Sequence, residues 1–552
     1  MSSKTMDCVI VGYNEPDLQD IIANWEKAKH GSGTFFDAMD GVIKLHNKWI
    51  SYADFLDAVL YAVDRKKRDI NIMSLPNLGL CYLKSFLNEK KLKIEIINSY
   101  NQEKKNLESI LQTGSRAVAI SSTFYSEPDP IKEIVKFIRR LDSETKIIVG
   151  GPYILRICNV EDILYQNYIL SYIDADIYIH DAQGELTLSR LLHELRKGEK
   201  GDIDSIPNLI YLKNKTGNIL GKRGTSRFKR TPREIESNDI NENIINWDLF
   251  SKKFYTPTTQ IRTSIGCSFK CAFCSFHKMA EQFMLASVKS IEIEMKRLHK
   301  AGVKNIIFVD DTLNVPHSRF KKILKTMIAN KFDFNWFSFF RCADADEETF
   351  ELMKTSGCKS VLLGIESADP HILKNMNKKA SVDKLRYGIK RLKELDIETI
   401  ASFIIGFPGE TEKTAESAFE FIRETKPDFY SLNLFCYFHN TPIHKKASEF
   451  GLQGAFYAWC HNTMDWRKAA ELIKVGYNSI TDSIILPARF NMWGIANLFG
   501  LGVPMAQIKE FMKLTHPILV KNHELSSVTS IEKTSSWESL LAAGQKIADS
   551  LN

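Results

Sequence analysis

Several features are scarce or missing in this chain of 552 residues, and each excludes a class of function. The amino end lacks the long apolar core and small-residue cleavage site of a secretory signal peptide, so we expect a cytoplasmic protein without paired structural disulfides. The most apolar late stretch, 484–506, is broken by proline, arginine and asparagine, which argues against a membrane-spanning helix. Lys and Arg (74) exceed Asp and Glu (67) by only seven, so no nucleic-acid partner is expected.

No internal repeat or low-complexity tract is found, and the length predicts three or four domains. Apolar runs at 7–11, 117–123 and 146–149 alternate with helical patterns, which indicates a parallel sheet covered on both faces. The aromatic-rich segment 14–74 is too long for an ordinary connection and is expected to be a folded insertion. We therefore predict a Rossmann-like α/β domain at residues 1–200 that contains this insertion.

Three further regions follow. Residues 201–258 are polar and rich in Lys and Arg, and we expect a linker with one hairpin; its basic run 222–233 is interpreted as solvated rather than phosphate-binding. Six strand–helix units in residues 259–445 predict a partial (β/α)6 barrel whose chemistry lies at the carboxyl ends of its strands. Residues 446–552 are expected to be mainly helical.

Three of the ten cysteines, Cys267, Cys271 and Cys274, lie within eight residues, just after a predicted strand. A loop this short can direct three sulfurs at one metal centre. A structural zinc site normally has a fourth protein ligand. An iron–sulfur cluster held by three cysteines leaves one iron free to bind a small molecule. We therefore expect an iron–sulfur cluster here, rather than a zinc site or three unrelated thiols.

The CxxxCxxC spacing, with Phe273 directly before the last cysteine, resembles the radical S-adenosylmethionine (SAM) superfamily. The resemblance implies a [4Fe-4S] cluster that binds SAM and, once reduced, cleaves it to a 5′-deoxyadenosyl radical. It also implies cofactor contacts at Phe273 and, at later strand ends, at Asp310, Asp311, Arg341, Glu366, Ser367, Gly406, Pro408, Gly409 and Glu410. The family usually has Gly-Gly-Glu where Asp310 and Asp311 stand, so a helix-capping role for Asp310 is the alternative.

The first domain resembles the cobalamin-binding module that precedes many radical SAM domains. Its small-residue turns imply cobalamin contacts at Tyr13, Ser121, Ser122, Thr123, Gly150, Gly151, Gly184 and Glu185. Only Gly184-Glu185 is kept of the usual Gly-Glu-Gly-Glu. The Asp-x-His-x-x-Gly motif, which gives cobalt a lower ligand in other proteins, is missing. The sequence therefore does not predict which residue would be the lower ligand of cobalt here. The alternative is a Rossmann-like domain that no longer binds cobalamin.

The whole chain resembles class B radical SAM methyltransferases, and residues 11–14 and 459–464 resemble the phosphinate P-methyltransferase-like subgroup. The resemblance implies that the protein uses cobalamin to methylate an unactivated carbon or phosphinate centre of a small-molecule or peptide substrate. It also implies an external electron donor such as flavodoxin or ferredoxin. Four residues are candidates for lining the substrate pocket, although core packing explains them equally well: Tyr437, His439, Trp459 and His461.

Three alternatives stay open. The first is a cobalamin-dependent radical SAM cyclase or rearrangement enzyme without methyl transfer, and the second is a non-catalytic cobalamin sensor. The third is a tRNA methylthiotransferase-like enzyme, which would carry a second cluster in its first domain. The three cysteines of that domain, Cys8, Cys81 and Cys158, do not stand at strand ends, and we interpret them as buried or incidental thiols.

Overall fold

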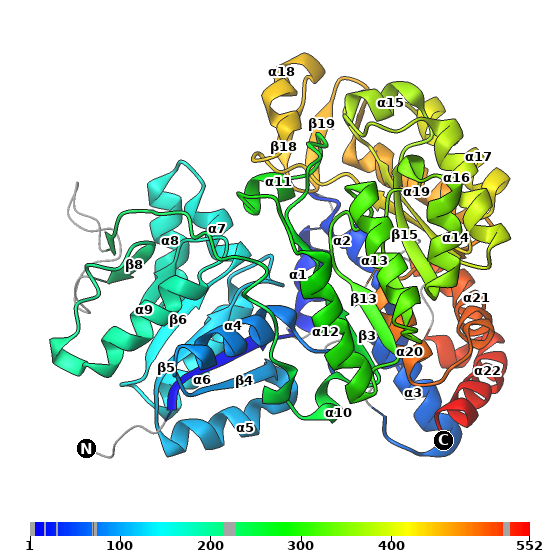
Figure 1. Cartoon of the computed structure of the whole chain (residues 1–552). Helices are drawn as coiled ribbons and strands as arrows, with labels where there is room; N and C mark the ends of the chain where they lie inside the picture. The colour runs from blue at the N-terminus through cyan, green and yellow to red at the C-terminus, as the bar shows by residue number, and fades with distance from the viewer. Residues whose placement is uncertain are drawn as a thin grey trace. The chain divides into compact units, whose positions relative to one another are not determined.

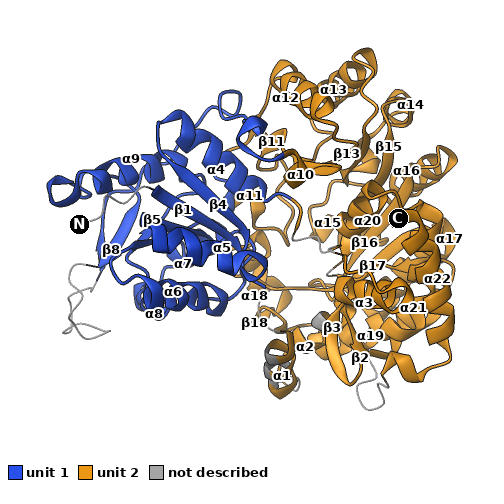
Figure 2. Ribbon diagram, turned by 90° about the horizontal axis from the view of Figure 1, so that it is seen from below, with its two compact units in different colours: residues 1–16, 76–251, 279–281 blue, residues 17–75, 252–278, 282–552 orange. Residues whose placement is uncertain are grey.

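The computed structural model describes residues 6–15, 18–28, 31–68, 70, 74–212, 228–488, 490–522 and 530–552. They group into two compact units, shown in blue and orange in Figure 2. Unit 1 comprises residues 1–16, 76–251 and 279–281, and unit 2 comprises residues 17–75, 252–278 and 282–552. Each unit is built on one large sheet flanked by helices, which confirms the predicted α/β class.

The sheet of unit 1 has five parallel strands and an antiparallel edge hairpin (Figure 1). In spatial order its strands are β4 (Ile94–Ser99), β1 (Met6–Tyr13), β5 (Ser115–Ser121), β6 (Lys146–Gly150), β7 (Ile177–Ile179), β8 (Leu209–Leu212) and β9 (Phe228–Arg230). The hairpin β8–β9 comes from the segment expected to be a linker. Residues 222–227 of the basic run in that segment lie outside the described residues.

Two separate apolar clusters hold helices against the two faces of this sheet, which explains why its strands read as continuous hydrophobic runs. One cluster carries α5 (Tyr100–Thr113), α6 (Asp129–Leu141), α7 (Pro152–Cys158) and α8 (Ile163–Ile173). The other carries α4 (Leu78–Glu89) and α9 (Glu185–Arg196).

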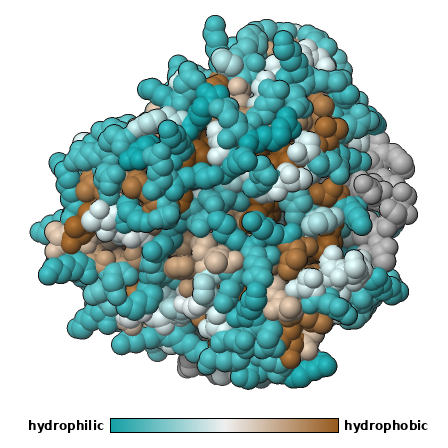
Figure 3. Space-filling model, turned by 90° about the vertical axis from the view of Figure 1, so that its right-hand side faces the viewer, coloured by the Kyte–Doolittle hydropathy of each residue, from teal (hydrophilic) through white to brown (hydrophobic). Residues whose placement is uncertain are grey.

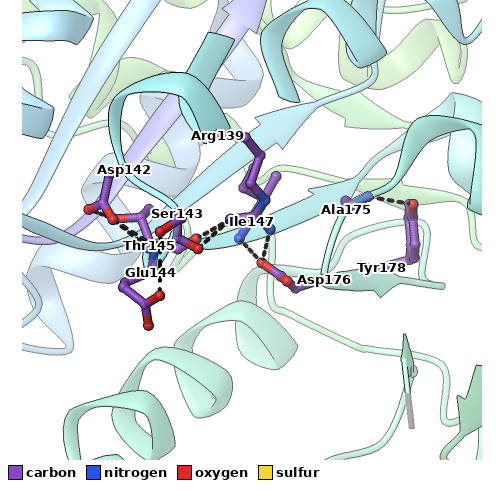
Figure 4. A network of polar contacts seen from close by, with 9 residues as sticks. All are labelled: Arg139, Asp142, Ser143, Glu144, Thr145, Ile147, Ala175, Asp176 and Tyr178. Atoms are coloured by element: carbon purple, nitrogen blue, oxygen red, sulfur yellow. Dashed lines mark hydrogen bonds and ion pairs between the residues drawn. The ribbon is translucent and has the colours of Figure 1, made fainter. Parts of the chain in front are cut away.

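A polar network fixes the amino ends of β6 and β7 (Figure 4). Asp176 accepts hydrogen bonds from the backbone N of Ile147 (2.8 Å) and from Arg139 of α6. Arg139 also donates to the carbonyl of Thr145 (2.7 Å), so one arginine joins α6 to both strands. Ligands bind at the opposite, carboxyl edge of parallel sheets. We therefore assign this network to stability rather than to function.

The main sheet of unit 2 contains seven parallel strands: β10 (Thr258–Ile261), β13 (Asn305–Phe308), β14 (Asn335–Phe340), β15 (Cys358–Glu366), β16 (Glu398–Ile405), β17 (Phe429–Leu434) and β21 (Ile484–Ile485). The first six are the predicted barrel strands. In the described chain β10 and β21 stay unpaired with each other, so the barrel is open, as expected.

Side chains alternate between the two faces of this sheet. On the outer face Trp336 packs against Phe320 of α13 (His317–Ala329) at 6.3 Å between ring centroids. On the inner face Phe337 and Phe339 contact α20 (Asn491–Gly500), through Phe499 and Trp493. Inner residues nearer the carboxyl ends, such as Leu362 and Ile404, are half-exposed.

The segment predicted as an insertion of the first domain is folded, but it belongs to unit 2. Its elements are α1 (Leu18–Ala28), α2 (Thr34–Ala38), β2 (Val42–Leu45), β3 (Lys48–Ser51) and α3 (Tyr52–Asp64). The segment packs through β2 on α21 (Met505–Asn522) and through α3 on α22 (Ser536–Leu551). The Tyr52 hydroxyl lies 2.7 Å from that of Thr515, and Asn522 donates to the carbonyl of Val42 (2.6 Å).

The region after the barrel is mainly helical, as predicted, with α19 (Trp466–Ser479) preceding α20 to α22. It also holds a small sheet of β18 (Gln453–Ala455), β19 (Ala458–His461) and β20 (Met464–Asp465). None of the described helices has the length and apolar character that a membrane span requires. On the face shown in Figure 3, hydrophilic residues predominate and hydrophobic residues form separate groups.

Candidate functional site

The three clustered cysteines occupy one loop of unit 2, between β10 and the short α11 (Phe276–Met279). Cys271 is buried, and Cys267 and Cys274 are half-buried. Two other segments hold the loop: the backbone N of Ala272 donates to the carbonyl of Met376 (2.8 Å), and the backbone N of Ile443 donates to the carbonyl of Ala272 (2.9 Å). These two backbone hydrogen bonds therefore hold the loop against its neighbouring segments.

The three thiols lie close enough to influence one another's ionisation. Burial raises the pKa of Cys274 to about 11, and the neighbouring Cys271, Asp311 and Cys267 add to the increase. Burial also raises the pKa of Cys271, while the cations of Lys378 and Arg341 oppose this increase. A cluster is held by thiolates, so its binding would release these protons. No group of three His, Cys, Asp or Glu side chains suited to a single metal ion occurs among the described residues.

Asp310 is buried where the chain enters the cysteine loop. Its Oδ1 accepts hydrogen bonds from the backbone N of Thr263 (2.8 Å) and from the hydroxyl of Ser264 (2.6 Å). Its Oδ2 finds no partner within the described chain. The next helix, α13, begins only at His317, so the helix-capping alternative for Asp310 is wrong. Asp310 instead fixes the backbone that leads into the loop.

Asp311 is half-buried beside the loop. Burial, with the adjacent Asp310, raises the pKa of Asp311 to about 7. Its charge in turn raises the pKa of Cys274. The next residue also faces the loop, because the Thr312 hydroxyl lies 3.7 Å from the sulfur of Cys267. The end of β13 thus brings a carboxyl and a hydroxyl to the thiols.

Arg341, at the end of β14, contacts the cysteine loop directly. Its guanidinium carbon lies 3.7 Å from the ring centroid of Phe269. It also donates to the carbonyl of Lys378 (2.6 Å) and to Asp344 (3.0 Å). Arg341 therefore braces the loop, whereas its predicted contact with SAM stays a prediction.

Lys378 is a site residue that the sequence analysis missed. It is 7% exposed, and its Nζ lies 3.0 Å from Oε1 of Glu366 and 5.9 Å from the ring centroid of Phe273. Glu366 itself has a left-handed backbone (φ +67°), which is strained for a residue with a side chain and is typical of functional sites. The adjacent Ser367 is buried, and its hydroxyl accepts from the backbone N of Asp369 (3.2 Å).

The turn after β16 contains the predicted residues Gly406, Pro408, Gly409 and Glu410. A Cβ on Gly406 (φ +92°) would lie 2.5 Å from Trp459, so only glycine fits this position. Glu410 is fully buried, and one of its oxygens accepts from the backbone N of Gly406. Its other oxygen, Oε1, is unpartnered in the part of the chain that the structure describes. Burial raises the pKa of Glu410 to about 8.

The Glu410 carboxyl is expected to make stability depend on pH. The folded chain keeps a proton that an exposed glutamate releases above about pH 4.3, so this contribution to stability is lost as pH rises from about 4.3 to 8. The variant Glu410→Gln cannot ionise. Its melting temperature relative to wild type should therefore be a few degrees higher at about pH 8.5 than at about pH 5.5. Glu412→Gln, at an exposed position, is the control; an equal effect of Glu410→Gln at both pH values would contradict the assignment.

The four predicted pocket residues gather at the barrel mouth. Trp459 and His461 stack at 5.2 Å, and His461 Nε2 lies 3.1 Å from the carbonyl of Gly406. Tyr437 contacts His444 (2.6 Å), and His439 lies 2.9 Å from the carbonyl of Gly454. Trp459 and His461 thus shape the turn after β16.

A polar cluster on the inner face of the barrel was also missed. Asn433 of β17 donates to the hydroxyls of Ser402 (3.0 Å) and Ser431 (3.2 Å), and all three side chains are half-exposed. The sequence gives little signal here, because small polar residues are common on one face of a strand.

In unit 1 the predicted cobalamin residues of β1, β5 and β6 meet at the carboxyl edge of the sheet. Gly150 pairs with Ser121, and a Cβ on Gly151 (φ +103°) would lie 3.1 Å from the hydroxyl of Ser122. Thr123 follows on the same turn, 2.9 Å from the hydroxyl of Ser121. At the end of β1, the ring of Tyr13 lies 5.9 Å from that of Phe124 and 6.0 Å from that of Tyr125.

Gly184 and Glu185 begin α9, whose N-terminus is already capped. The carboxylate of Glu236 accepts from the backbone N of Leu186 (2.9 Å) and of Thr187 (2.6 Å). Glu185 is buried and accepts from Asn238 (3.2 Å). This turn therefore holds the segment that follows β9, and its contact with cobalamin stays a prediction.

Cys8, Cys81 and Cys158 do not form a second cluster site. Cys8 lies in β1 and Cys158 in α7, and they belong to the apolar clusters on opposite faces of the sheet. Burial raises the pKa of both thiols to about 12. Cys81 is buried in α4. Their interpretation as buried thiols is confirmed.

Residues 261–422 match the family model described as the Radical SAM superfamily. These residues form a radical SAM domain. An uncharacterized methyltransferase of Pyrococcus horikoshii is 26% identical over 412 residues, which cover 71% of this chain and 81% of that protein.

Two solved structures share the fold of the whole chain. The radical SAM methyltransferase TsrM from Kitasatospora setae, with cobalamin and a [4Fe-4S] cluster bound, matches at a TM-score of 0.63 and 13% identity, covering 99% of this chain and 100% of that one. The cobalamin-dependent SAM radical enzyme OxsB, with aqua-cobalamin bound, matches at a TM-score of 0.55 and 14% identity. The match covers 99% of this chain and 80% of that one. This likeness confirms the predicted fold, whereas the phosphinate P-methyltransferase-like subgroup stays a prediction.

Proposed function

We propose that this chain is a cobalamin-dependent radical SAM methyltransferase. The loop of Cys267, Cys271 and Cys274, in a radical SAM domain, is the observation that carries the proposal. The fold shared with TsrM and OxsB, and the identity to a methyltransferase over most of the chain, support it. When bound, the reduced cluster supplies the electron that cleaves SAM, and cobalamin supplies the carrier for the methyl group.

The chain's own residues prepare the cluster site. Three thiols of a fixed loop are the donors that a [4Fe-4S] cluster needs, with one iron left for SAM. The cations of Lys378 and Arg341 favour the thiolate of Cys271, since both lower its pKa. Ala272 ties the loop to two other segments, so the sulfurs need little reorganisation on binding.

SAM is proposed to bind at the carboxyl ends of β13 to β16. The carboxyl of Asp311, near Cys274, can accept hydrogen bonds from the SAM ammonium. Lys378, held by Glu366, offers a cation for the SAM carboxylate. Gly406 and Gly409 let the backbone approach the adenosine. Asp310 follows β13 and Glu410 follows β16, the first and last strands of this proposed site. One carboxyl oxygen of each has no hydrogen-bond partner among the described residues.

Cobalamin is proposed to bind at the carboxyl edge of the unit 1 sheet. Ligands of such sheets lie beyond the carboxyl ends of the strands. Gly150 and Gly151 pack closely against Ile179 and Ser122 at this edge, and Ser121 and Thr123 offer hydroxyls beside them. Tyr13 offers an aromatic face at the end of β1.

The substrate is proposed to be a small molecule or peptide that is methylated on a carbon or phosphinate centre. A TsrM structure contains tryptophan as its substrate, which supports a small-molecule substrate for this type of enzyme. In this chain Ser402, Ser431 and Asn433 offer hydrogen-bonding groups on the half-exposed inner face of the barrel. An external flavodoxin or ferredoxin is the proposed source of electrons.

Anaerobic reconstitution with iron, sulfide and hydroxocobalamin tests this function. We expect a protein that holds one four-iron cluster and one corrinoid, and that cleaves SAM to 5′-deoxyadenosine under reduction. Once a substrate is found, its mass should increase by one methylene unit. A product with an unchanged number of carbons and a cyclised or rearranged skeleton would indicate a cyclase or rearrangement enzyme. Corrinoid binding without SAM cleavage would indicate a sensor.

A further inference from the structure

The cysteine loop lies among segments rich in lysine. Three segments meet there: residues 268–278, 374–379 and 440–446. Besides the backbone bonds of Ala272, Asn377 donates to the carbonyl of Lys270 (2.8 Å), and Lys278 donates to the carbonyl of Asn440 (2.7 Å). These segments contain seven lysines and neither aspartate nor glutamate. Their charge equals the formal net charge of the whole chain, +7.

Six of these lysines are exposed, and we call them the lysine collar: Lys270, Lys278, Lys374, Lys379, Lys445 and Lys446. The seventh, Lys378, is buried against Glu366. Within the part of the chain that the structure describes, the collar lysines pair with no carboxylate. Some exposed lysines on the outer helices are, in contrast, paired with acidic residues, for example Lys296 with Glu292 and Lys325 with Glu348.

We propose that the lysine collar is the docking surface for a small acidic one-electron carrier protein. The inference rests on the proposed function, because it requires a cluster at the cysteine loop. Positive charges that are not paired with carboxylates attract an acidic partner protein and orient it as the two proteins meet. Since the segments that carry the collar contact the loop, a partner seated there would have its redox centre near a cluster held by the loop. The reduced carrier would give one electron to a cluster held by Cys267, Cys271 and Cys274 and would itself be oxidised by one electron.

The test compares two reductants on the full-length reconstituted enzyme. One is flavodoxin kept reduced by its reductase and NADPH, and the other is dithionite, which needs no docking surface. The variant Lys374→Glu/Lys445→Glu/Lys446→Glu should lower flavodoxin-driven SAM cleavage by about tenfold or more at low ionic strength. Its dithionite-driven rate should stay within about twofold of wild type.

A matched variant carries the same charge change away from the collar. Lys300, Lys322 and Lys331 are exposed on or just after α12 (Val288–Ala301) and α13, and their replacement by Glu should leave both rates unchanged. In wild type, added salt should slow the flavodoxin-driven reaction and spare the dithionite-driven one, because screening weakens long-range attraction. This measurement needs no variant to fold.

Three results would overturn the proposal. The first is an unchanged flavodoxin-driven rate in the collar variant. The second is an equal loss with both reductants, which would assign these lysines to the cluster or SAM site. The third is normal SAM cleavage with loss of substrate methylation alone, which would make the collar a site for an anionic substrate. A wild-type enzyme that fails to cleave SAM even with dithionite would instead refute the proposed function.

Discussion

The variant Cys271→Ala is expected to form no detectable 5′-deoxyadenosine from SAM. Cys271 is the most buried of the three loop thiols, and the cations of Lys378 and Arg341 favour its thiolate. With only two thiols left, the loop cannot hold a four-iron cluster with one open iron. The reconstituted variant should also lack the brown colour and the iron content of wild type.

Cys460→Ala is the control for this experiment, because Cys460 is an exposed thiol on β19, outside the loop. It should retain both the cluster and SAM cleavage. Full activity in Cys271→Ala would refute the cluster role of the loop, whereas equal losses in both variants would point to general thiol damage.

Lys378→Met is expected to weaken both the fold and the reaction. The change leaves the Glu366 carboxylate buried without its cation, and loss of one partner of a buried ion pair costs about 3–5 kcal/mol. Denaturant unfolding of the chain measures this loss. SAM cleavage should also fall, by about tenfold or more, because the cation beside Cys271 is removed.

The double variant Lys378→Met/Glu366→Gln separates the two effects. A neutral amide tolerates burial beside methionine better than a carboxylate does, so stability should largely recover. SAM cleavage should not recover, because the positive charge is still missing. Recovery of both would show that Lys378 serves only to neutralise Glu366.

The barrel was predictable because its strands carry their own signal. Runs such as 305–309 and 429–434 are apolar and bounded by helical patterns, and each is a strand in the structure. The cysteine loop was predictable because its function depends on spacing within eight residues. Both features are local in the sequence.

Features that depend on distant contacts were not predictable. Lys378 lies in a lysine-rich run that resembles a solvated loop, and only its contact with Glu366 distinguishes it. The aromatic content of 14–74 indicated a folded segment but not its location, because Tyr52 packs against Phe490 and Phe511 near the other end of the chain. The role of Asp310 likewise depends on Thr263, 47 residues away.

The packing of α3 on α21 and α22 has a consequence for biosynthesis. Tyr52 of α3 and its partner Thr515 of α21 are 463 positions apart, so α3 leaves the ribosome long before the helices that cover it. The second unit therefore cannot be completed until α21 and α22 have been synthesised, whereas most of the first unit is contiguous in the chain. A nascent chain is thus expected to expose the apolar side of α3 until α21 and α22 have been synthesised.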